Sequence, residues 1–406
     1  MKILAITLML VGLVGCAGVQ KVVTTTPEQV AAARPAVAAL QAGNFEDALK
    51  AAQAVLVEDA SNPQAGLVAG ISRYQGVMHN FYRDMTSIIG GAFVGRAINH
   101  RMLKWALEQA EGELDKVEKD LAAASAASDV SLELCLACWE RDWNHNGEVD
   151  ERDRLLFQIE LDKDGKEIPE GDPRRKPTFH FDLGDVFWAR AMVSFQRAAF
   201  NLVLAYQLPE MGELMAASRE SVITIKMVDL ARVHQARDLI LAGLDHADRA
   251  RKEYLKETDD VGEWVPNPEQ KNHPLPLPVD QLLYETWEGV LRDLRALLKG
   301  EEGISVAEAA QLGDHQWENP PQGFINIKKL LDNPGDIVIR LDSVDALESE
   351  RSKENVEKVL KDILGEKYVP QMKPTPLLRR LARMKREMEQ GEDSLERKLR
   401  YLFWLN

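Results

Sequence analysis

The sequence predicts a mostly all-α protein, an array of packed helices that is interrupted by insertions at residues 129–181 and 301–342. Three segments carry this prediction. Residues 100–127 are rich in Ala, Leu, Glu and Lys with charged residues on one face, which is typical of a surface helix. Residues 184–208 are apolar around much of their circumference, and residues 279–299 form a clean amphipathic pattern. The helix over 184–208 is therefore expected at the centre of the core.

Length and charge restrict the class of protein. The chain has 406 residues, enough for a large core and about two or three domains. Its apolar content of 45% is ordinary for a globular protein. The net charge of −15 argues against nucleic acid as a partner, because binding nucleic acid depends on a basic surface. The same charge is compatible with a protein that attracts divalent cations.

The first residues form a targeting segment. An apolar stretch at residues 3–14 is too short to span a bilayer as a helix, and it ends in Leu13-Val14-Gly15-Cys16. This ending resembles the lipobox of bacterial lipoproteins. The resemblance implies a signal peptide at residues 1–15 and cleavage before Cys16, whose thiol then carries diacylglycerol and whose N-terminus carries a further acyl chain, such as palmitate, in many bacteria.

The lipid would anchor the protein to a membrane, with residues 16–26 as a short tether. Ala17 follows the lipidated cysteine, whereas Asp at this place favours retention in the inner membrane. The expected location is therefore the periplasmic face of the outer membrane of a Gram-negative bacterium. A plain secretory signal with an incidental cysteine is the alternative.

Residues 27–128 are expected to form paired helices, and one part of them resembles the centre of a tetratricopeptide repeat. The residues that carry the resemblance lie at the turn and where the helices approach each other: Gly43, Phe45, Ala48, Ala52, Asn62 and Pro63. A single repeat cannot bury its apolar face alone, so stacked neighbours are expected. Only one clear copy is found. Either later helices fill the other places with diverged sequence, or the array is of its own kind.

Ser128 and Asp129 predict a cap for a helix over residues 130–141, which carries Cys135 and Cys138. In an oxidising compartment a disulfide between these cysteines is the default expectation. Buried thiols and a redox or metal site remain as alternatives. The pair lacks the strand context of a thioredoxin motif and the two further ligands of a zinc site.

The loop at residues 142–153 is the one stretch that predicts a ligand. Its oxygen-bearing residues, with Gly147 at position 6 and Val149 at position 8, have the spacing of a calcium-binding EF-hand loop. Because Asp closes it, the loop resembles the dockerin-type EF-hands of secreted bacterial proteins. The candidate calcium ligands are Asp142, Asn144, Asn146, Glu148 (through its carbonyl), Asp150 and Asp153. A turn rich in Asp and Asn that caps a helix is the alternative.

A second acidic loop follows directly, with its later positions one residue out of register. It is either a degenerate second metal site or a solvated turn. Its candidate ligands are Glu160, Asp162, Asp164 and Asp172.

The rest of the chain divides into a long-helix region at 182–300, the irregular insertion at 301–342 and C-terminal helices at 343–406. Residues 258–278 form a Pro-rich loop, expected to lie over the helices or to serve as a proline ligand for a partner. Residues 324–341 predict a hairpin, or a short helix and a strand. Further helices are expected over residues 223–257, 343–364 and 375–402.

No catalytic motif is found in the sequence, so the protein is not expected to be an enzyme. The expected function is a lipid-anchored periplasmic scaffold that binds another envelope protein and is braced by structural calcium. Some periplasmic helical-repeat lipoproteins accompany TRAP-type transporters. A solute-binding accessory of such a transporter is therefore an alternative, and a large apolar pocket open to solvent would favour it. A redox protein acting through Cys135 and Cys138 is a third possibility.

Overall fold

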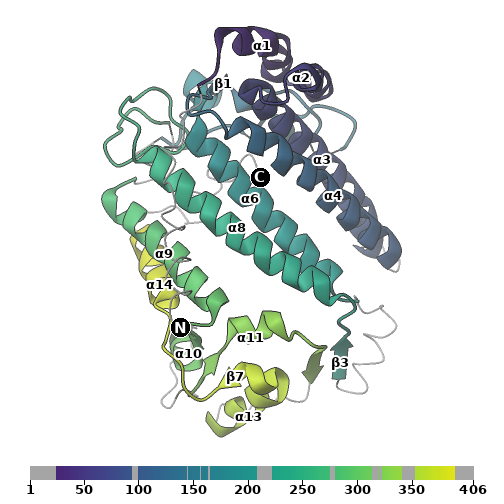
Figure 1. The fold of residues 1–406 in the computed structure, drawn as a ribbon, viewed down its shortest axis with the longest axis vertical. Coiled ribbons are helices and arrows are strands. Elements are labelled where there is room, and N and C mark those ends of the chain that lie inside the picture. The colour runs from purple at the N-terminus through teal and green to yellow at the C-terminus, as the bar shows by residue number, and fades with distance from the viewer. Residues whose placement is uncertain are drawn as a thin grey trace, which may run out of the picture.

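The fold is known from a computed structural model, which is mostly helical, as the sequence predicts (Figure 1). It describes residues 24–93, 99–143, 145–155, 157–162, 165–207, 222–274, 279–312, 320, 322–340 and 353–388. Three of the predicted site residues, Cys16, Asn144 and Asp164, lie outside these described residues. Among the helices that the structure describes, none has an apolar stretch long enough to cross a membrane.

The N-terminal region begins with a helix hairpin, α1 (Pro27–Gln41) and α2 (Phe45–Glu58), followed by α3 (Pro63–Phe93). Gly43 in the hairpin turn has a φ of 75°, a left-handed conformation that glycine adopts without strain. A Cβ atom at this position would lie 3.3 Å from Cδ1 of Trp139, so the turn also needs glycine for close packing.

Small buried residues and one asparagine side chain hold α1, α2 and α3 together. Ala48 and Ala52 are fully buried on α2. The Asn62 side chain accepts a hydrogen bond from the Ala65 amide and donates one to the Gln29 carbonyl, both at 3.0 Å, which ties the start of α3 to α1. However, α3 alone has 31 residues, whereas a whole tetratricopeptide repeat of two helices has about 34. Beyond the hairpin the structure is therefore a helical array of its own kind.

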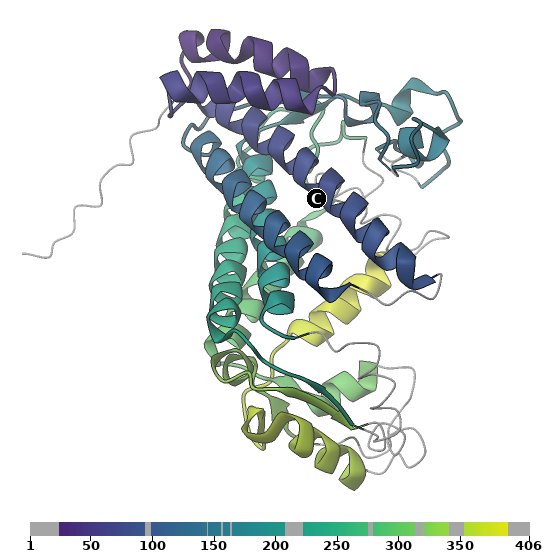
Figure 2. The same ribbon diagram turned by 90° about the vertical axis from the view of Figure 1, so that its right-hand side faces the viewer.

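Four long helices continue the array in order: α4 (His100–Ala124), α6 (Leu183–Leu204), α8 (Leu230–Tyr254) and α9 (Gln281–Lys299). Each packs against the preceding one, and α4 also packs on α3 (Figures 1 and 2). The central place of α6, between α4 and α8, is the one predicted from its apolar circumference. The array thus has a continuous core that runs from the N-terminal hairpin to α9.

Ion pairs supplement the apolar contacts between these helices. Arg190 on α6 contacts Glu118 on α4 at 2.6 Å, and Arg197 contacts Glu111 at 3.0 Å. These four side chains are all largely buried, so each charge needs its partner. The register between α4 and α6 is therefore set by charge as well as by shape.

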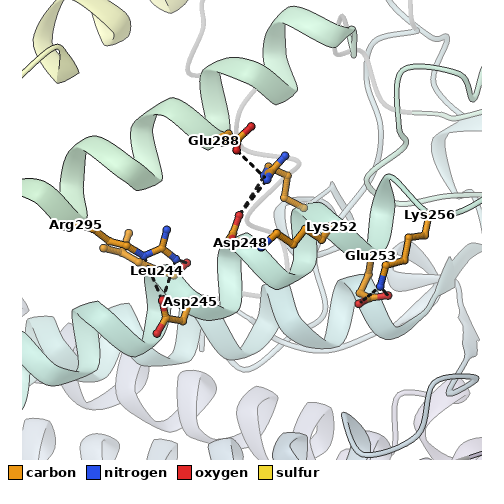
Figure 3. Close-up of polar contacts among 9 residues, drawn as sticks. Leu244, Asp245, Asp248, Lys252, Glu253, Lys256, Glu288 and Arg295 are labelled. Atoms are coloured by element: carbon orange, nitrogen blue, oxygen red, sulfur yellow. Dashed lines mark hydrogen bonds and ion pairs between the residues drawn. The ribbon is translucent and has the colours of Figure 1, made fainter. Parts of the chain in front are cut away.

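A polar contact of the same kind lies between α8 and α9 (Figure 3). Arg295 of α9 donates to the Leu244 carbonyl at 2.7 Å and pairs with Asp245 at 3.0 Å. Glu288 of α9 lies 3.6 Å from the Arg251 guanidinium of α8. These contacts hold α9 along α8, although the pairs to Asp245 and Glu288 lie at the exposed rim.

The prediction of a helix over residues 130–141 is wrong. The segment forms strand β1 (Leu132–Leu134) and a 3-10 turn, η1 (Leu136–Cys138). Strand β1 pairs antiparallel with β2 (Phe179–Phe181), so a two-stranded ribbon closes the insertion that contains both acidic loops. The reason is that burial in β1 alternates with a period of two, and a partner far along the chain supplies the hydrogen bonds.

The helix predicted over residues 223–257 is right only from α8 onward. It is preceded by strand β3 (Val222–Ile225), which is rich in β-branched residues and pairs antiparallel with β6 (Ile337–Arg340). Of the two alternatives for residues 324–341, the structure has the short helix α11 (Ile327–Asp332) and the strand β6. The hairpin alternative is therefore wrong.

Short elements complete the described chain. Strands β4 (Ile304–Ser305), β5 (Phe324–Ile325) and β7 (Tyr368–Val369) form a small antiparallel sheet. The remaining elements are α5 (Glu151–Leu155), η2 (Pro173–Arg175), α10 (Val306–Leu312), α13 (Lys353–Leu364), η3 (Gly365–Lys367) and α14 (Leu377–Met388). The described parts of the two predicted C-terminal helices are α13 and α14.

The described part of the Pro-rich loop is ordered over the helices, as one alternative proposed. Trp264 is fully buried. The Asn267 side chain donates to the Tyr254 carbonyl at 3.0 Å, and the Gly262 carbonyl accepts from the His180 amide at 2.9 Å. The loop therefore joins the end of α8 to the β1–β2 ribbon.

Candidate functional site

The calcium loop predicted at residues 142–153 folds around the carboxylate of its first residue. The Asp142 carboxylate accepts hydrogen bonds from the Asn146 amide at 3.1 Å and from the Gly147 amide at 2.8 Å. Gly147 has a φ of 96°, a conformation that residues with a side chain rarely adopt. The turn after Asp142 therefore depends on glycine at position 6, as the spacing predicts.

The end of the loop is closed by two aspartates that cap α5. Asp150 accepts hydrogen bonds from the amides of Arg152 at 2.8 Å and Asp153 at 3.2 Å. The buried Asp153 carboxylate accepts in return from the Asp150 amide at 3.0 Å and from the Trp143 amide at 2.8 Å. The final candidate ligand thus bridges the beginning and the end of the loop.

The middle of the loop is held by Asn146. Its side chain accepts from the Glu148 amide at 2.9 Å and donates to Asp150 at 2.7 Å. The same hydrogen bonds are expected in a helix-capping turn and in a calcium loop without its cation. In the second case, a carboxylate oxygen that accepts from an amide could bind the metal ion in its place. The structure therefore brings the described candidate ligands into one small loop, and calcium binding stays a prediction.

Aromatic side chains attach the loop to the N-terminal helices. The Trp143 ring lies 5.3 Å from the Phe157 ring and 6.1 Å from the Phe45 ring of α2. His145 bonds through Nε2 to the His79 carbonyl of α3 at 2.9 Å, and the two imidazole rings are 4.0 Å apart. The loop is thus fastened to α2 and α3.

Burial and the nearby Arg141 guanidinium lower the pKa of His79 to about 4. Its imidazole is therefore neutral at physiological pH. A neutral His79 adds no positive charge beside the acidic loop, so it does not oppose cation binding there.

The second acidic loop is arranged as a tight turn. Leu161 and Glu167 form an antiparallel bridge, and the Asp162 carboxylate accepts from the Lys166 amide at 2.9 Å. Asp172 caps η2 and forms an ion pair with Arg174 at 2.7 Å. This geometry is compatible with both interpretations, and metal binding by the second loop stays a prediction.

The two cysteines of the insertion are joined to each other. A disulfide links Cys135 and Cys138, whose Cα atoms are 5.3 Å apart across the η1 turn. Cys138 is exposed, while the neighbouring Leu136 is fully buried. The bond thus closes the turn between β1 and the calcium loop.

Sequence reasoning missed an acidic cluster made by Asp182, Glu257 and Glu263. Their carboxylate oxygens all lie within 4.8 Å of one another. Asp182 caps α6, Glu257 follows α8, and Glu263 is buried in the Pro-rich loop. Glu257 and Glu263 lie close together in the sequence, but Asp182 is far from both, so no local motif predicts the cluster.

Burial raises the pKa of the Glu257 and Glu263 carboxyl groups, and the nearby Asp182 carboxylate raises both further. The pKa of Glu263 is raised to about 8 and that of Glu257 to about 11. Beside them, the Tyr254 hydroxyl donates to the buried Asp185 carboxylate at 2.8 Å. Carboxylates this close need protons or a cation to offset their repulsion.

We expect Glu263→Gln to remove the contribution of Glu263 to the pH dependence of stability, while the contribution of Glu257, whose pKa is raised to about 11, remains. A raised pKa in the folded state means that the folded protein binds the proton more tightly than the unfolded chain. The contribution of Glu263 to the free energy of unfolding is then greatest at low pH, and it falls as the pH rises from about 4.5 to about 8. With a chelator present, the wild type is expected to lose about 2–4 kcal/mol over this range from Glu263.

The measurement is urea unfolding at several pH values. Glu269→Gln, an exposed change in the same loop, is the matched control and should keep the wild-type profile. A Glu263→Gln profile with the wild-type slope would show that the Glu263 carboxyl titrates normally.

A groove of about 560 Å³ runs between α2, α3 and α4 beside the calcium loop. Trp105 lines it and is 53% exposed, a large value for tryptophan. Arg73, another lining residue, is paired with Asp120 at 2.8 Å. The groove therefore combines apolar and charged walls.

Arg141, directly before the calcium loop, is the unusual member of this groove. Its guanidinium lies 5.2 Å from the centre of the Phe45 ring and 5.5 Å from that of Trp143. Burial lowers the pKa of Arg141. It makes no ion pair with any residue that the structure describes. A half-buried guanidinium held on two rings is well placed to receive a carboxylate.

Comparisons with known proteins supply no relative for this geometry. A scan against models of protein families finds no match, and searches of curated proteins and of solved structures find no significant similarity.

Proposed function

We propose that this protein is a lipid-anchored helical scaffold on the periplasmic face of the outer membrane, where it binds another envelope protein. The observation that carries the proposal is the groove between α2, α3 and α4, with Trp105 exposed and Arg141 without an ion-pair partner among the described residues. Aromatic and arginine side chains are the types that contribute most to protein interfaces. The expected partner presents an acidic group to Arg141 and an apolar side chain to Trp105.

The calcium loop supports this proposal through its position. Arg141 immediately precedes Asp142, and His145 fastens the middle of the loop to His79, which lines the groove. Calcium bound by this loop would fix the backbone on both sides of these contacts. Arg141 would then be held in place before the partner arrives, which reduces the entropy lost on binding.

The lipid anchor is proposed from the motif that ends at Cys16. In the structure, the backbone amide and hydroxyl of Thr25 donate to Asp129 at 2.7 and 2.9 Å. The tether thus ends on the fold just before α1, near the turn that leads to β1. A tether that ends here would join the fold in the same N-terminal region that contains the groove.

Photo-crosslinking in the native host tests this function. A photoreactive amino acid at Trp105 is expected to give one discrete adduct with an envelope protein. Arg141→Ala should reduce the adduct by at least about tenfold, because a charge-assisted hydrogen bond contributes about 1.5–3 kcal/mol.

The control is the same photoreactive residue at Val57, which is 86% exposed on α2 and does not line the groove. It should give no such adduct. Equal adducts at both positions, or none at Trp105, would contradict the proposed use of the groove.

A further inference from the structure

The groove between α2, α3 and α4 contains a glycine that the packing of the fold does not explain. Gly76 lies inside α3 and lines the groove. Glycine inside a helix lowers the stability of the helix relative to alanine. At Gly66, earlier in α3, a Cβ atom would lie 2.9 Å from the Asp120 carbonyl oxygen, and at Gly70 it would lie 2.6 Å from Cδ2 of Leu121. These two glycines therefore allow α3 to pack closely on α4.

Gly76 has no such neighbour. A Cβ atom at this position would meet nothing within 4 Å among the described residues, so the space above it is part of the groove. The α4 side of the groove contributes Ala106 and Ala110, which are also small. Glycine is the residue that lets the main chain of a ligand come close to a helix. The space over Gly76 is therefore suited to a bound chain.

Two polar side chains on α3 flank this space. Ser72 precedes Gly76 by four residues and His79 follows it by three, so all three share one face of the helix. Ser72 is 2% exposed, and its Oγ has no hydrogen-bond partner among the described residues. The same is true of Nδ1 of His79, and both residues line the groove. A ligand that supplies the missing partners would remove the cost of leaving these atoms unsatisfied.

The spacing of the two side chains suits a peptide main chain. Ser72 and His79 are seven residues apart, which is about 10 Å along a helix axis. An extended chain covers this length with about three residues. A main chain also carries both donors and acceptors along its length, and a hydroxyl and an imidazole can pair with either.

We propose that the partner binds through an extended segment whose main chain lies over Gly76 and whose hydrogen-bonding groups reach Ser72 and His79. An aspartate or glutamate of the same segment then pairs with Arg141, which lies near His79. This inference rests on the proposed scaffold function, because it concerns the same groove. It names the part of the partner that enters the groove.

Filling the space over Gly76 tests the inference. The photoreactive amino acid at Trp105 is combined with Gly76→Leu. The adduct is expected to fall more than tenfold, because the leucine side chain occupies the place of the bound main chain.

Gly112→Leu is the matched control. Gly112 lies inside α4, a Cβ atom there would also meet nothing within 4 Å, and the residue does not line the groove. This variant should keep the wild-type adduct. Because both changes replace a helical glycine with a good helix former, both proteins should unfold at or above the wild-type temperature.

Ser72→Ala tests the hydrogen bond to the segment. Loss of one neutral hydrogen bond is expected to reduce the adduct about threefold to tenfold. The variant should be at least as stable as the wild type in thermal unfolding, because the hydroxyl that it loses has no partner among the described residues. Wild-type crosslinking, or a loss of stability that accompanies the loss of the adduct, would contradict the role of Ser72 in binding.

Mass spectrometry of the wild-type adduct identifies the segment. The crosslinked residue is expected to have aspartate or glutamate within about three residues, the length of chain that spans Ser72 and His79. A synthetic peptide of this segment should bind the full-length wild type and Gly112→Leu equally, and Gly76→Leu at least tenfold more weakly. A crosslinked lipid, or a segment without an acidic residue, would overturn the inference.

The failures of the two proposals differ. No discrete adduct at Trp105 in the wild type contradicts the scaffold function, and this inference with it. A wild-type adduct that Gly76→Leu leaves unchanged overturns this inference alone.

Discussion

Replacing Trp139 with alanine is expected to lower the free energy of unfolding by about 3–5 kcal/mol. Trp139 is 3% exposed, and its ring contacts those of Phe45 at 4.9 Å and Phe157 at 5.9 Å edge to face. Its Nε1 donates to the Leu40 carbonyl at 2.9 Å. The substitution removes the link between the insertion and the α1–α2 hairpin and leaves a cavity, although the Leu40 carbonyl keeps the Gly43 amide as a donor at 2.9 Å.

Urea unfolding followed by circular dichroism measures this effect, since the change removes a fluorophore. Trp105→Ala is the control, because the Trp105 side chain is 53% exposed; its effect should stay within about 0.5 kcal/mol. A Trp139→Ala protein as stable as this control would show that the insertion does not brace the hairpin.

Calcium at about one hundred times its dissociation constant is expected to stabilise the protein by about 2.7 kcal/mol. Extracellular sites of this type bind at about 10⁻⁴–10⁻³ M, so calcium in the tens of millimolar is needed for the full effect. Asp142→Ala and Asp153→Ala should each abolish the calcium-dependent increment. The increment is the quantity to compare, because the Asp153 carboxylate also accepts from the Trp143 and Asp150 amides without metal.

Isothermal titration and thermal unfolding, with and without calcium, measure this increment. Asp47→Ala, an exposed change on α2, is the matched control and should keep it. Asp172→Ala separates the two loops: an unchanged increment confirms that the second loop is a solvated turn. No heat and no stabilisation in the wild type at millimolar calcium would contradict the calcium site.

The long helices were predictable because their signals are local. The helix expected at 279–299 is α9, which Asp280 caps by accepting from the Leu283 amide at 2.8 Å. Gly300 ends it with a φ of 73°. The periodicity of apolar residues and the capping residues lie within one segment, so they can be read without knowing the fold.

The strands were not predictable in the same way. Strand β1 pairs with β2, and β3 pairs with β6. In the sequence, several helices lie between β3 and β6. A strand of three or four residues has no hydrogen bonds of its own, so its existence depends on a partner that the local pattern does not name. For this reason residues 130–141 and the start of 223–257 were wrongly predicted as helix.

The sequence by itself determined the helical class, the spacing of the loop from Asp142 to Asp153 and the motif at Cys16, because each depends on neighbours along the chain. Only the tertiary structure decided how the loop is fastened to His79, and which carboxylates meet at Glu263. It alone also decided that α2, α3 and α4 leave a groove between them. Burial and long-range contact are properties of packed helices, and no single segment encodes them.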